Sequence, residues 1–292
     1  MGHRAGFVNI IGNPNVGKST IMNALVGEKL SIITSKAQTT RHRIMGIVNG
    51  DDFQIVYSDT PGIINPKYKL QEAMMSFVKI ALSDADVILY VTDVREDPSS
   101  EKEFRDRIKA AATPMIIAVN KIDLSNQEEL EKITTAWMGS FPESPVIPVS
   151  GLKKFNLETL LNAILSRLPE SEPYFPKDQL TDRYERFFAS EILREKILVN
   201  YRKEVPYSVE VEIESFTEED KIIKIRALIH VARDSQKGIL IGHRGSMLKK
   251  VGTEARKDME GFFGKKVFLE LYVRVTKDWR DKPAMLKRFG YR

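Results

Sequence analysis

Residues 12–19, Gly-Asn-Pro-Asn-Val-Gly-Lys-Ser, decide how the rest of the chain is interpreted. An apolar run over residues 7–11 precedes them and predicts a buried strand. A helical pattern over residues 20–26 follows, and Gly27 ends it. A strand, a glycine-rich loop and a helix in this order are the context in which the pattern G-x-x-x-x-G-K-[ST] indicates a phosphate-binding site.

The residue types in this loop suit a polyphosphate. Gly12 and Gly17 let the backbone bend so that its N–H groups converge, and the positive end of the helix dipole adds to them. Lys18 can reach the outer phosphates, and Ser19 can offer a hydroxyl to Mg²⁺. The alternative is an ordinary β–α turn with a solvated lysine, which the flanking strand and helix disfavour.

The composition is that of a globular protein with two domains. The chain has 292 residues, of which 42% are hydrophobic and 29% charged. It has no cysteine, which excludes disulfides and cysteine-ligated zinc and predicts a reducing, cytoplasmic setting. Its four histidines lack metal-ligand spacing, no apolar run is long enough to span a bilayer, and the first residues do not have the pattern of a signal peptide.

Charge is distributed unevenly along the chain. Residues 1–175 contain 19 basic and 21 acidic residues, a net charge of −2, whereas residues 176–292 contain 26 and 19, a net charge of +7. Residues 237–292 alone contain 15 basic and 6 acidic residues, a net charge of +9. This asymmetry predicts that the C-terminal end binds a polyanion.

The first half alternates strand and helix patterns, which predicts a mostly parallel sheet with helices on both faces. The turn Asn49-Gly50-Asp51-Asp52 indicates a hairpin, so one strand should be antiparallel. Six strands are expected, at residues 7–11, 44–48, 53–57, 87–91, 115–119 and 146–149. Helices are expected near residues 70–82, 100–112, 127–138 and 156–168, the last with Asn156 as its N-cap.

Three further motifs follow predicted strands, at the sheet edge where α/β folds bind ligands. In Asp59-Thr60-Pro61-Gly62, the carboxylate can hold Mg²⁺ through water and the Gly62 N–H can meet a terminal phosphate. In Asn120-Lys121-Ile122-Asp123, the Asp123 carboxylate matches the two donors on one edge of guanine, which adenine lacks. Backbone N–H groups of Ser150-Gly151-Leu152 can reach the base carbonyl. Each motif alone also suits an ordinary turn.

Taken together in this order, the four motifs resemble the translation-factor-like branch of GTP-binding proteins over about residues 5–168. The resemblance implies GTP and GDP as ligands, with catalytic contributions from Asn15, Lys18, Thr40 and Gly62. It implies Mg²⁺ at Ser19, Asp59 and a threonine of the first switch, for which the family pattern favours Thr40 over Thr39. The implied nucleotide site comprises Asn13, Asn15, Val16, Gly17, Lys18, Ser19, Thr20, Asp59, Gly62, Asn120, Lys121, Asp123, Ser150, Gly151 and Leu152. Arg41 and Arg43 are expected to be solvated charges of the switch, although they could contact phosphate.

One departure concerns the residue after Asp-Thr-Pro-Gly. Ras-like enzymes place a glutamine there to orient the attacking water, whereas this chain has Ile63, which has no polar side-chain atom. The sequence instead resembles GTPases with a hydrophobic residue at this position. Many of those share the Pro-Asn-x-Gly-Lys-Ser loop, and there the asparagine, Asn15 here, helps to hold a K⁺ where an arginine finger would act.

The second half begins after a stretch with three prolines in residues 169–176, which predicts an extended linker. We expect a first domain over residues 1–169, a linker over 170–180 and a second domain over 181–292. Thr181 or Asp182 should cap a helix with an apolar stripe from Tyr184 to Leu198. The charges beside the stripe should form a solvated face; they are Arg183, Arg186, Arg194 and Lys196.

The remaining patterns give the order α-β-β-α-α-β, with Gly242-His243-Arg244-Gly245 joining two helices. Strands are expected at 208–214, 222–229 and 267–273 and a helix at 246–262, while Ile239 to Ile241 are expected in the core. This arrangement resembles a type II KH domain over about residues 180–280, in which a G-x-x-G loop clamps about four single-stranded nucleotides. The resemblance implies RNA binding by Gly242, His243, Arg244, Gly245, Lys249 and Lys250.

The basic tail from Lys277 to Arg292 contains Trp279, Phe289 and Tyr291. Two interpretations stay open for it. The rings can extend an RNA surface by stacking on bases, or the tail can pack as a capping helix.

A GTPase domain followed by one KH domain resembles the Era family over nearly the whole chain. The resemblance implies a GTP-hydrolysing switch that binds the 3′ region of small-subunit ribosomal RNA and acts in 30S subunit maturation. Nothing in the sequence indicates a permanent protein partner, and a monomer is expected. One alternative is a nucleotide-dependent RNA-binding module with negligible hydrolysis. Another is a signalling GTPase at a membrane surface, peripherally associated through its basic tail, although the chain has no lipidation motif.

Overall fold

The computed structural model describes residues 2–36, 38–98 and 113–291. The helix expected near residues 100–112 lies outside them. The chain divides into two compact units. The first comprises Met1–Ser31, Thr40–Asn65 and Met75–Asp182, and the second comprises Ile32–Thr39, Pro66–Met74 and Arg183–Arg292. No helix among the described residues has the length and apolar content needed to cross a membrane.

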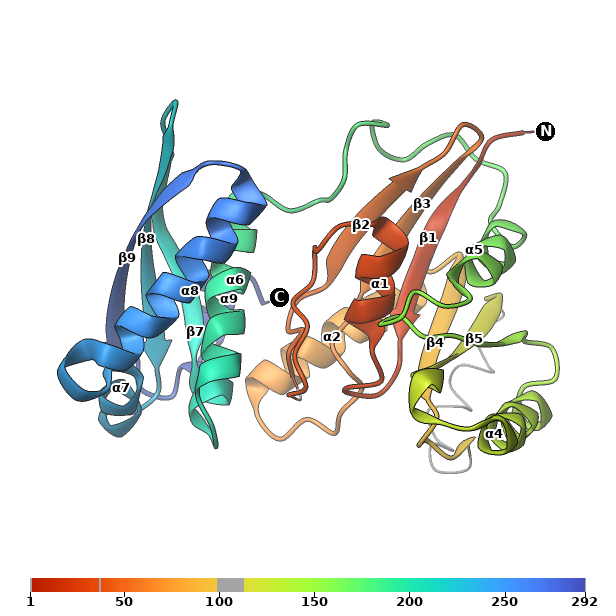
Figure 1. The fold of residues 1–292 in the computed structure, drawn as a ribbon, viewed down its shortest axis with the longest axis horizontal. Helices are drawn as coiled ribbons and strands as arrows, with labels where there is room; N and C mark the ends of the chain where they lie inside the picture. The colour runs from red at the N-terminus through yellow and green to blue at the C-terminus, as the bar shows by residue number, and fades with distance from the viewer. Residues whose placement is uncertain (1, 37, 99–112, 292) are drawn as a thin grey trace. The chain divides into compact units, whose positions relative to one another are not determined.

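The first unit is built on a mixed sheet, which has six strands within the described residues (Figure 1). Their order is β2-β3-β1-β4-β5-β6, and only the β2–β3 pair among them is antiparallel, as the hairpin signal predicts. The strands are β1 (Arg4–Ile11), β2 (Ile44–Asn49), β3 (Phe53–Asp59), β4 (Val87–Asp93), β5 (Met115–Asn120) and β6 (Val146–Pro148). The predicted fold class of this half is confirmed.

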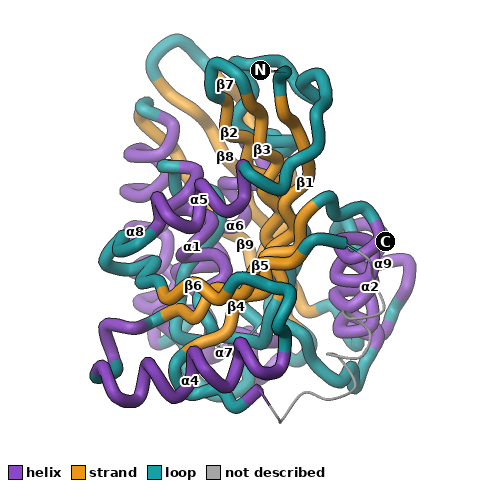
Figure 2. Tube along the Cα trace, turned by 90° about the vertical axis from the view of Figure 1, so that its right-hand side faces the viewer, coloured by secondary structure: helices purple, strands orange, loops and turns teal. Residues whose placement is uncertain are grey.

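Helices cover both faces of this sheet. Helices α1 (Lys18–Val26) and α5 (Leu157–Leu165) lie on one face and α2 (Lys69–Ser83) on the other (Figures 1 and 2). Helix α4 (Gln127–Ser140) begins where the Asn126 side chain accepts the N–H of Glu129. Its Trp137 packs in one apolar cluster with Val78 of α2 and residues of β4 and β5. Strands β4 and β5 are buried along their whole length, which explains their continuous apolar sequence.

The expectation that Arg41 and Arg43 are solvated is wrong, because the two side chains are 0% and 7% exposed. The Arg43 guanidinium donates to Ser58 Oγ at 2.6 Å, to Asn9 Oδ1 at 3.2 Å, and to both carboxylate oxygens of Asp84 at 2.5 and 3.0 Å. It therefore ties β2 to β1, β3 and the end of α2. The sequence around Arg43 could not reveal these hydrogen bonds, because their acceptors are distant in sequence.

Replacing Arg43 by alanine should lower the free energy of unfolding by about 1–3 kcal/mol, because the buried side chains of Asn9 and Ser58 would lose their donor and the exposed Asp84 would lose its ion pair. Lys132→Ala is the matched control, since its ion pair with Glu128 is exposed and should contribute less than about 0.5 kcal/mol. Urea unfolding monitored by circular dichroism measures both changes. Equal midpoints for the two variants would show that the buried network does not stabilise the fold.

The second unit contains a smaller sheet, which has three strands among the described residues. The strands are β7 (Glu210–Glu218), β8 (Ile222–Val231) and β9 (Lys266–Val275), in that order. Strand β8 pairs antiparallel with β7 and parallel with β9. The helices are α6 (Glu185–Asn200), α7 (Asp234–Ile241) and α8 (Ser246–Phe263), which pack on one face of the sheet (Figure 1). This confirms the predicted α-β-β-α-α-β order.

Several local predictions for α6 and α7 are wrong. Helix α6 begins at Glu185 after Tyr184, not at a Thr181 or Asp182 cap. Both of those side chains instead bond the backbone of Met45 on β2, so they belong to the first unit. Arg194 is only 1% exposed and pairs with Glu191 at 2.6 Å, so it does not belong to a solvated face. In α7, Ile239 is 51% exposed and lies outside the core.

The tail packs against the sheet of the second unit. Trp279 is fully buried and donates from Nε1 to the carbonyl of Ser208, and Tyr291 donates to Glu210 Oε2. Phe289, after the short helix α9 (Pro283–Arg288), packs against Trp279 and against His230 of β8. The capping interpretation is therefore correct, and the rings of Trp279 and Tyr291 are not available for stacking on bases.

Residues 170–182 run along the first unit, mostly without regular secondary structure and with a turn from Pro176 to Gln179. Gln54 of β3 accepts from the N–H groups of Tyr174 and Phe175 and donates to the Phe175 carbonyl. Further along, the Leu180 carbonyl accepts the N–H of Ile47. The prolines predict an extended linker, whereas the structure has a turn between Pro176 and Gln179 and shows which strands the segment follows.

Candidate functional site

The loop between β1 and α1 is shaped by close approaches that exclude side chains. A Cβ on Gly12 would lie 2.0 Å from the carbonyl oxygen of Val91, and one on Gly17 would lie 2.2 Å from Asn120 Nδ2. Gly17 also has a φ of 98° and directly precedes α1. These two glycines are therefore fixed by packing and backbone conformation at once.

Lys18 is held inside this loop. Its Nζ donates to the carbonyls of Gly12 and Asn13 at 3.0 and 2.7 Å. Burial lowers its pKa to about 8, while the nearby Asp59 carboxylate opposes the shift. The ammonium group therefore stays mostly protonated at neutral pH. It is a desolvated positive charge at the start of a helix, where an anionic ligand would be stabilised.

Ser19, Thr40 and Asp59 converge beside this lysine. Ser19 Oγ donates to Asp59 Oδ2 at 2.6 Å, and Thr40 Oγ1 lies 2.9 Å from Ser19 Oγ and 3.3 Å from Asp59 Oδ2. Thr39 instead bonds Thr34 and the Lys36 carbonyl. The geometry thus places Thr40, not Thr39, in this cluster.

The three side chains fit a magnesium ion. They supply hydroxyl and carboxylate oxygens, the ligand type that Mg²⁺ prefers. Asp59 Oδ1 is buried and has no hydrogen-bond partner among the described residues, and burial raises the pKa of this carboxyl. A bound cation would interact with the unpartnered oxygen and would stabilise the ionised form of the buried carboxylate.

Asn120 connects three loops. Its Nδ2 donates to the Val16 carbonyl at 2.8 Å, and its Oδ1 accepts the Gly151 N–H at 3.0 Å. The side chain is only 3% exposed. Asn120 therefore links the phosphate loop to the loop of residues 150–152 by hydrogen bonds. The sequence motif alone does not reveal this role.

Lys121 and Asp123 follow Asn120 in the chain and contact the neighbouring loops. Lys121 Nζ donates to the Asn15 carbonyl at 2.5 Å and to Asp93 Oδ2 at 2.7 Å. Asp123 is exposed, and its Oδ1 accepts from Ser150 Oγ at 2.5 Å. Ser150 thus fixes the carboxylate while leaving its other oxygen open to a ligand.

The sequence analysis missed two acidic residues near the loop. Asp93 pairs with Lys121, and Glu96 accepts from Asn13 Nδ2 at 2.9 Å and from Thr92 Oγ1 at 2.7 Å. Asp93 is the last residue of β4 and Glu96 follows it, and the carboxyl end of β4 lies at the same edge of the sheet as the phosphate loop. That position is the signal that could have identified them.

Gly62 and Ile63 follow β3 on the other side of the loop. A Cβ on Gly62 would lie 2.7 Å from Pro14 Cα, and the Ile63 N–H donates to the Gly12 carbonyl at 3.2 Å. The Ile63 side chain packs against the apolar cluster around Trp137. The chain therefore has no side-chain donor or acceptor at the position where Ras-like enzymes have glutamine.

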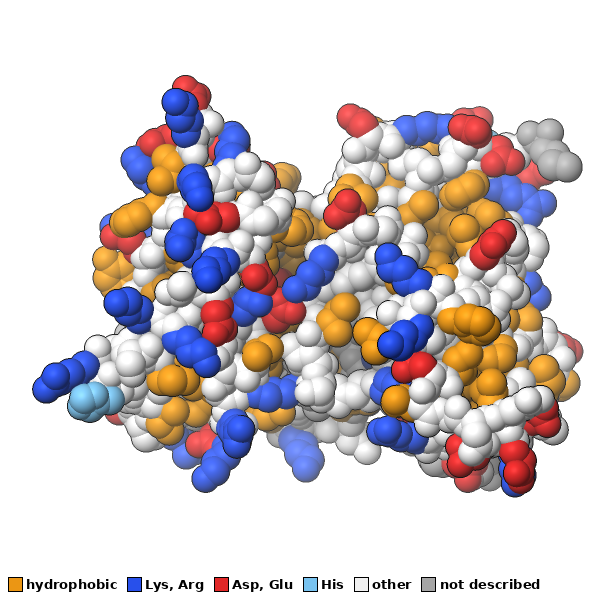
Figure 3. All heavy atoms as spheres, viewed as in Figure 1, with side chains coloured by type: hydrophobic (Ala, Val, Ile, Leu, Met, Phe, Trp, Pro, Cys, Tyr) orange, Lys and Arg blue, Asp and Glu red, His pale blue; other side chains and the backbone are white. Residues whose placement is uncertain are grey.

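In the second unit, Gly242-His243-Arg244-Gly245 links α7 to α8. Gly242 and Gly245 have φ of 73° and 78°. A Cβ on Gly242 would meet Met247 at 2.7 Å, whereas nothing lies within 4 Å of one on Gly245. His243 and Arg244 are exposed, as are Lys249 and Lys250 in the first turns of α8. The loop therefore presents open backbone beside four basic or ionisable side chains, and basic side chains are spread over this end of the unit in Figure 3.

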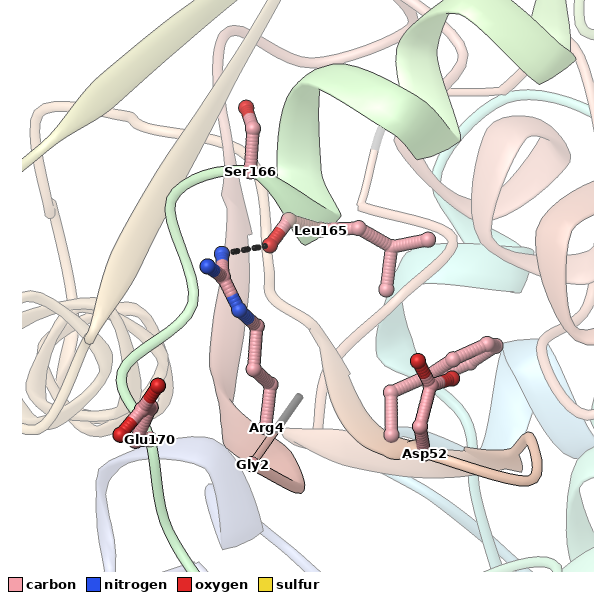
Figure 4. Close-up of a pocket in the computed structure, with 7 residues that line it drawn as sticks. Gly2, Arg4, Asp52, Leu165, Ser166 and Glu170 are labelled. Atoms are coloured by element: carbon pink, nitrogen blue, oxygen red, sulfur yellow. Dashed lines mark hydrogen bonds between the residues drawn. The ribbon is translucent and has the colours of Figure 1, made fainter.

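A pocket of about 370 Å³ lies at the opposite edge of the large sheet, lined by Gly2, Arg4, Asp52, Phe53, Leu165, Ser166 and Glu170 (Figure 4). There Arg4 donates to the Leu165 carbonyl at the end of α5. Arg4 begins β1 and the phosphate loop follows its end, so this pocket is separate from the nucleotide residues.

Comparisons with known proteins give matches to both halves of the chain. A family model described as 50S ribosome-binding GTPase matches residues 7–121, and a KH domain model matches residues 204–280. The chain is 45% identical over 291 residues to GTPase Era of Syntrophus aciditrophicus, covering 99% of this chain and 95% of that protein. It is 42% identical to GTPase Era of Staphylococcus epidermidis, covering 99% and 97%.

Two solved structures are similar over 99% of both chains, each with a TM-score of 0.95. One is a variant of Aquifex aeolicus Era bound to GDP·AlF₄⁻, at 41% identity. The other is Era in complex with MgGDPNP and nucleotides 1506–1542 of 16S ribosomal RNA, at 40% identity. The chain belongs to the GTPase Era family.

Proposed function

We propose that this protein is a GTP-hydrolysing switch that binds the 3′ region of small-subunit ribosomal RNA and acts in 30S subunit maturation. The observation that carries the proposal is the coexistence of a complete guanine-nucleotide constellation and an open, basic G-x-x-G loop in one chain. The solved complex of Era with MgGDPNP and 16S ribosomal RNA nucleotides supports it. The proposed division is a GTP-binding domain over residues 1–169 and an RNA-binding domain over 181–292, acting in the cytoplasm.

The positions of the residues around the phosphate loop support the following nucleotide roles. Lys18 and the N–H groups of residues 15–19 bind the phosphates, joined by the N–H of Gly62. Ser19, Thr40 and Asp59 would hold Mg²⁺, which would supply positive charge to the phosphate oxygens. Asp123 accepts the two donors of guanine, while Asn120 and Ser150 position its surroundings. Asn13, Val16, Thr20, Lys121, Gly151 and Leu152 complete the site.

The RNA roles follow from the second loop. The N–H groups around Gly245 and the side chains of His243 and Arg244 bind the phosphates of a single strand, and Lys249 and Lys250 extend the contact along α8. Gly242 keeps the loop turned by packing against Met247.

Hydrolysis by this protein alone should be slow and faster in K⁺ than in Na⁺. Ile63 cannot place the attacking water, and Asn15 is exposed in a left-handed conformation with φ of 66°, open to help hold a cation. Asn15→Ala should remove the difference between K⁺ and Na⁺ more than it weakens GTP binding. Phosphate release under multiple turnover measures the rates, and nucleotide titration provides the binding control. Equal rates in K⁺ and Na⁺ for the unchanged protein would contradict the cation role.

The test of the whole proposal is crosslinking in cells followed by identification of the bound RNA. Recovery of the 3′ region of small-subunit ribosomal RNA is expected, and recovery of unrelated RNA would overturn it. The same phosphate-release assay tests the alternative of a module with negligible hydrolysis. Sedimentation with anionic liposomes tests the alternative of a membrane-surface GTPase, for which the buried aromatic rings of the tail give no support.

A further inference from the structure

The sheet of the second unit has an outer face, opposite α6, α7 and α8, that is only half covered. Glu210, Leu228 and His230 on this face are at most 5% exposed. Phe289 packs on His230, and Tyr291 bonds Glu210. The tail therefore covers one half of the outer face and buries its apolar and acidic residues.

The other half is open and carries aromatic and basic side chains. Along β9, Val267, Leu269 and Leu271 pack into the core, so Phe268, Glu270 and Tyr272 point to the outer face. Phe268 and Tyr272 are 52% and 48% exposed. This open half, here called the aromatic platform, comprises Lys224, Arg226, Phe268, Glu270, Tyr272 and Arg274.

The strand register brings these residues together. Lys224 pairs with Phe268, Arg226 with Glu270, and Leu228 with Tyr272. The Arg226 guanidinium lies 5.6 Å from the centre of the Tyr272 ring and 3.2 Å from Glu270. The two rings are four residues apart on one strand, so they are separated by roughly 13 Å. Lys224 and Arg226 form ion pairs with Glu219 and Glu270 at 2.7 and 3.2 Å, and the exposed Arg274 adds a further positive charge on this face.

We propose that the aromatic platform binds single-stranded RNA, as a second contact surface distinct from the G-x-x-G loop. Exposed rings beside positive charges are the combination that single-stranded nucleic acids recognise, because every base has a face that stacks and every linkage is anionic. The inference rests on the proposed RNA-binding function and assigns a further part of that RNA to a surface.

The position of β9 connects the two surfaces. It is the edge strand next to β8, and both α7 and α8 pack against it. Gly252 of α8 directly faces Leu271, where a Cβ would lie 2.9 Å from the leucine. An RNA strand bound on the helix face of this unit could therefore cross the edge of the sheet at β9 and reach the aromatic platform on the outer face.

The test compares two single-stranded RNAs of the ribosomal 3′ sequence by fluorescence anisotropy. One has about four nucleotides, which the G-x-x-G loop holds, and the other has about twelve. The double variant Phe268→Leu with Tyr272→Leu keeps apolar surface and removes both rings. It should bind the short RNA as before and the long RNA at least about tenfold more weakly. Arg226→Gln should also reduce the salt dependence of long-RNA binding.

Tyr184→Leu is the matched control, because that ring is 86% exposed and directly precedes α6, which packs on the other face of the sheet. It should leave both affinities unchanged. Unchanged long-RNA affinity in the double variant would overturn the platform while leaving the proposed function intact, and so would crosslinks from residues 268 and 272 that go to protein alone. Failure of the unchanged protein to bind either RNA would overturn the proposed function itself.

Discussion

Asp123→Asn should convert the protein from a GTP-binding to a xanthosine-triphosphate-binding form. Asp123 is exposed, and Ser150 Oγ fixes one of its oxygens at 2.5 Å, so the carboxylate has a defined orientation toward a base. Two charge-assisted hydrogen bonds to guanine would be lost, and the new amide N–H₂ would face the donors of guanine. GTP affinity should fall by about 3–5 kcal/mol.

Xanthine has a carbonyl at C2 that can accept from the new amide, so its triphosphate should bind better to the variant than GTP does. Titration calorimetry with both nucleotides in the presence of Mg²⁺ measures the change. Glu131→Gln is the charge-matched control, because Glu131 is an exposed carboxylate on α4 and its change should leave both affinities as they were. A continued preference of Asp123→Asn for GTP would remove this residue from base recognition.

The variant Ser150→Ala tests whether Ser150 only positions the Asp123 carboxylate or itself recognises the base. It removes the hydroxyl that holds Asp123 but keeps the carboxylate, so GTP affinity should fall by only about 1 kcal/mol, without any gain for xanthosine triphosphate. A reversal of specificity in Ser150→Ala would instead mean that the hydroxyl itself reads the base.

Gly245→Asp should abolish binding to the G-x-x-G loop. Open space surrounds the Cα of Gly245, so the added carboxylate would occupy the approach of an RNA phosphate and repel it. A loss of about 3 kcal/mol, or two orders of magnitude in affinity, is expected for a short single-stranded RNA. GTP affinity measured without RNA should not change, because no nucleotide residue is altered.

Gly245→Asn is the matched control for this change. Both asparagine and aspartate tolerate the left-handed backbone at φ of 78°, and they have nearly the same volume. Only the negative charge differs between the two variants, so Asn should retain a larger share of the affinity. Retention of full RNA binding by Gly245→Asp, with thermal unfolding unchanged, would show that this loop is not the clamp.

The order of the elements and the residue types of the nucleotide site are predictable from the sequence. The strand–loop–helix pattern around residues 12–19 predicts the phosphate loop, because glycines and a lysine at fixed spacing leave few other backbone solutions. The hairpin signal at Asn49-Gly50 predicts the antiparallel β2–β3 pair that the structure has. Such patterns depend on residues that are close together in the chain, so they can be recognised from the sequence alone.

The sequence does not reveal which polar residues are structural, because this depends on contacts made in the folded chain. Arg43 and Arg194 appear in polar stretches, yet both are buried in networks whose partners are reached through folding. The aromatic residues of the tail appear equally suited to stacking and to packing, and the outer face of the small sheet accepts them. Asn120 belongs to a base-recognition motif, but its amide holds two loops together. Burial and long-range pairing decide these roles, and neither is encoded in the spacing of a motif.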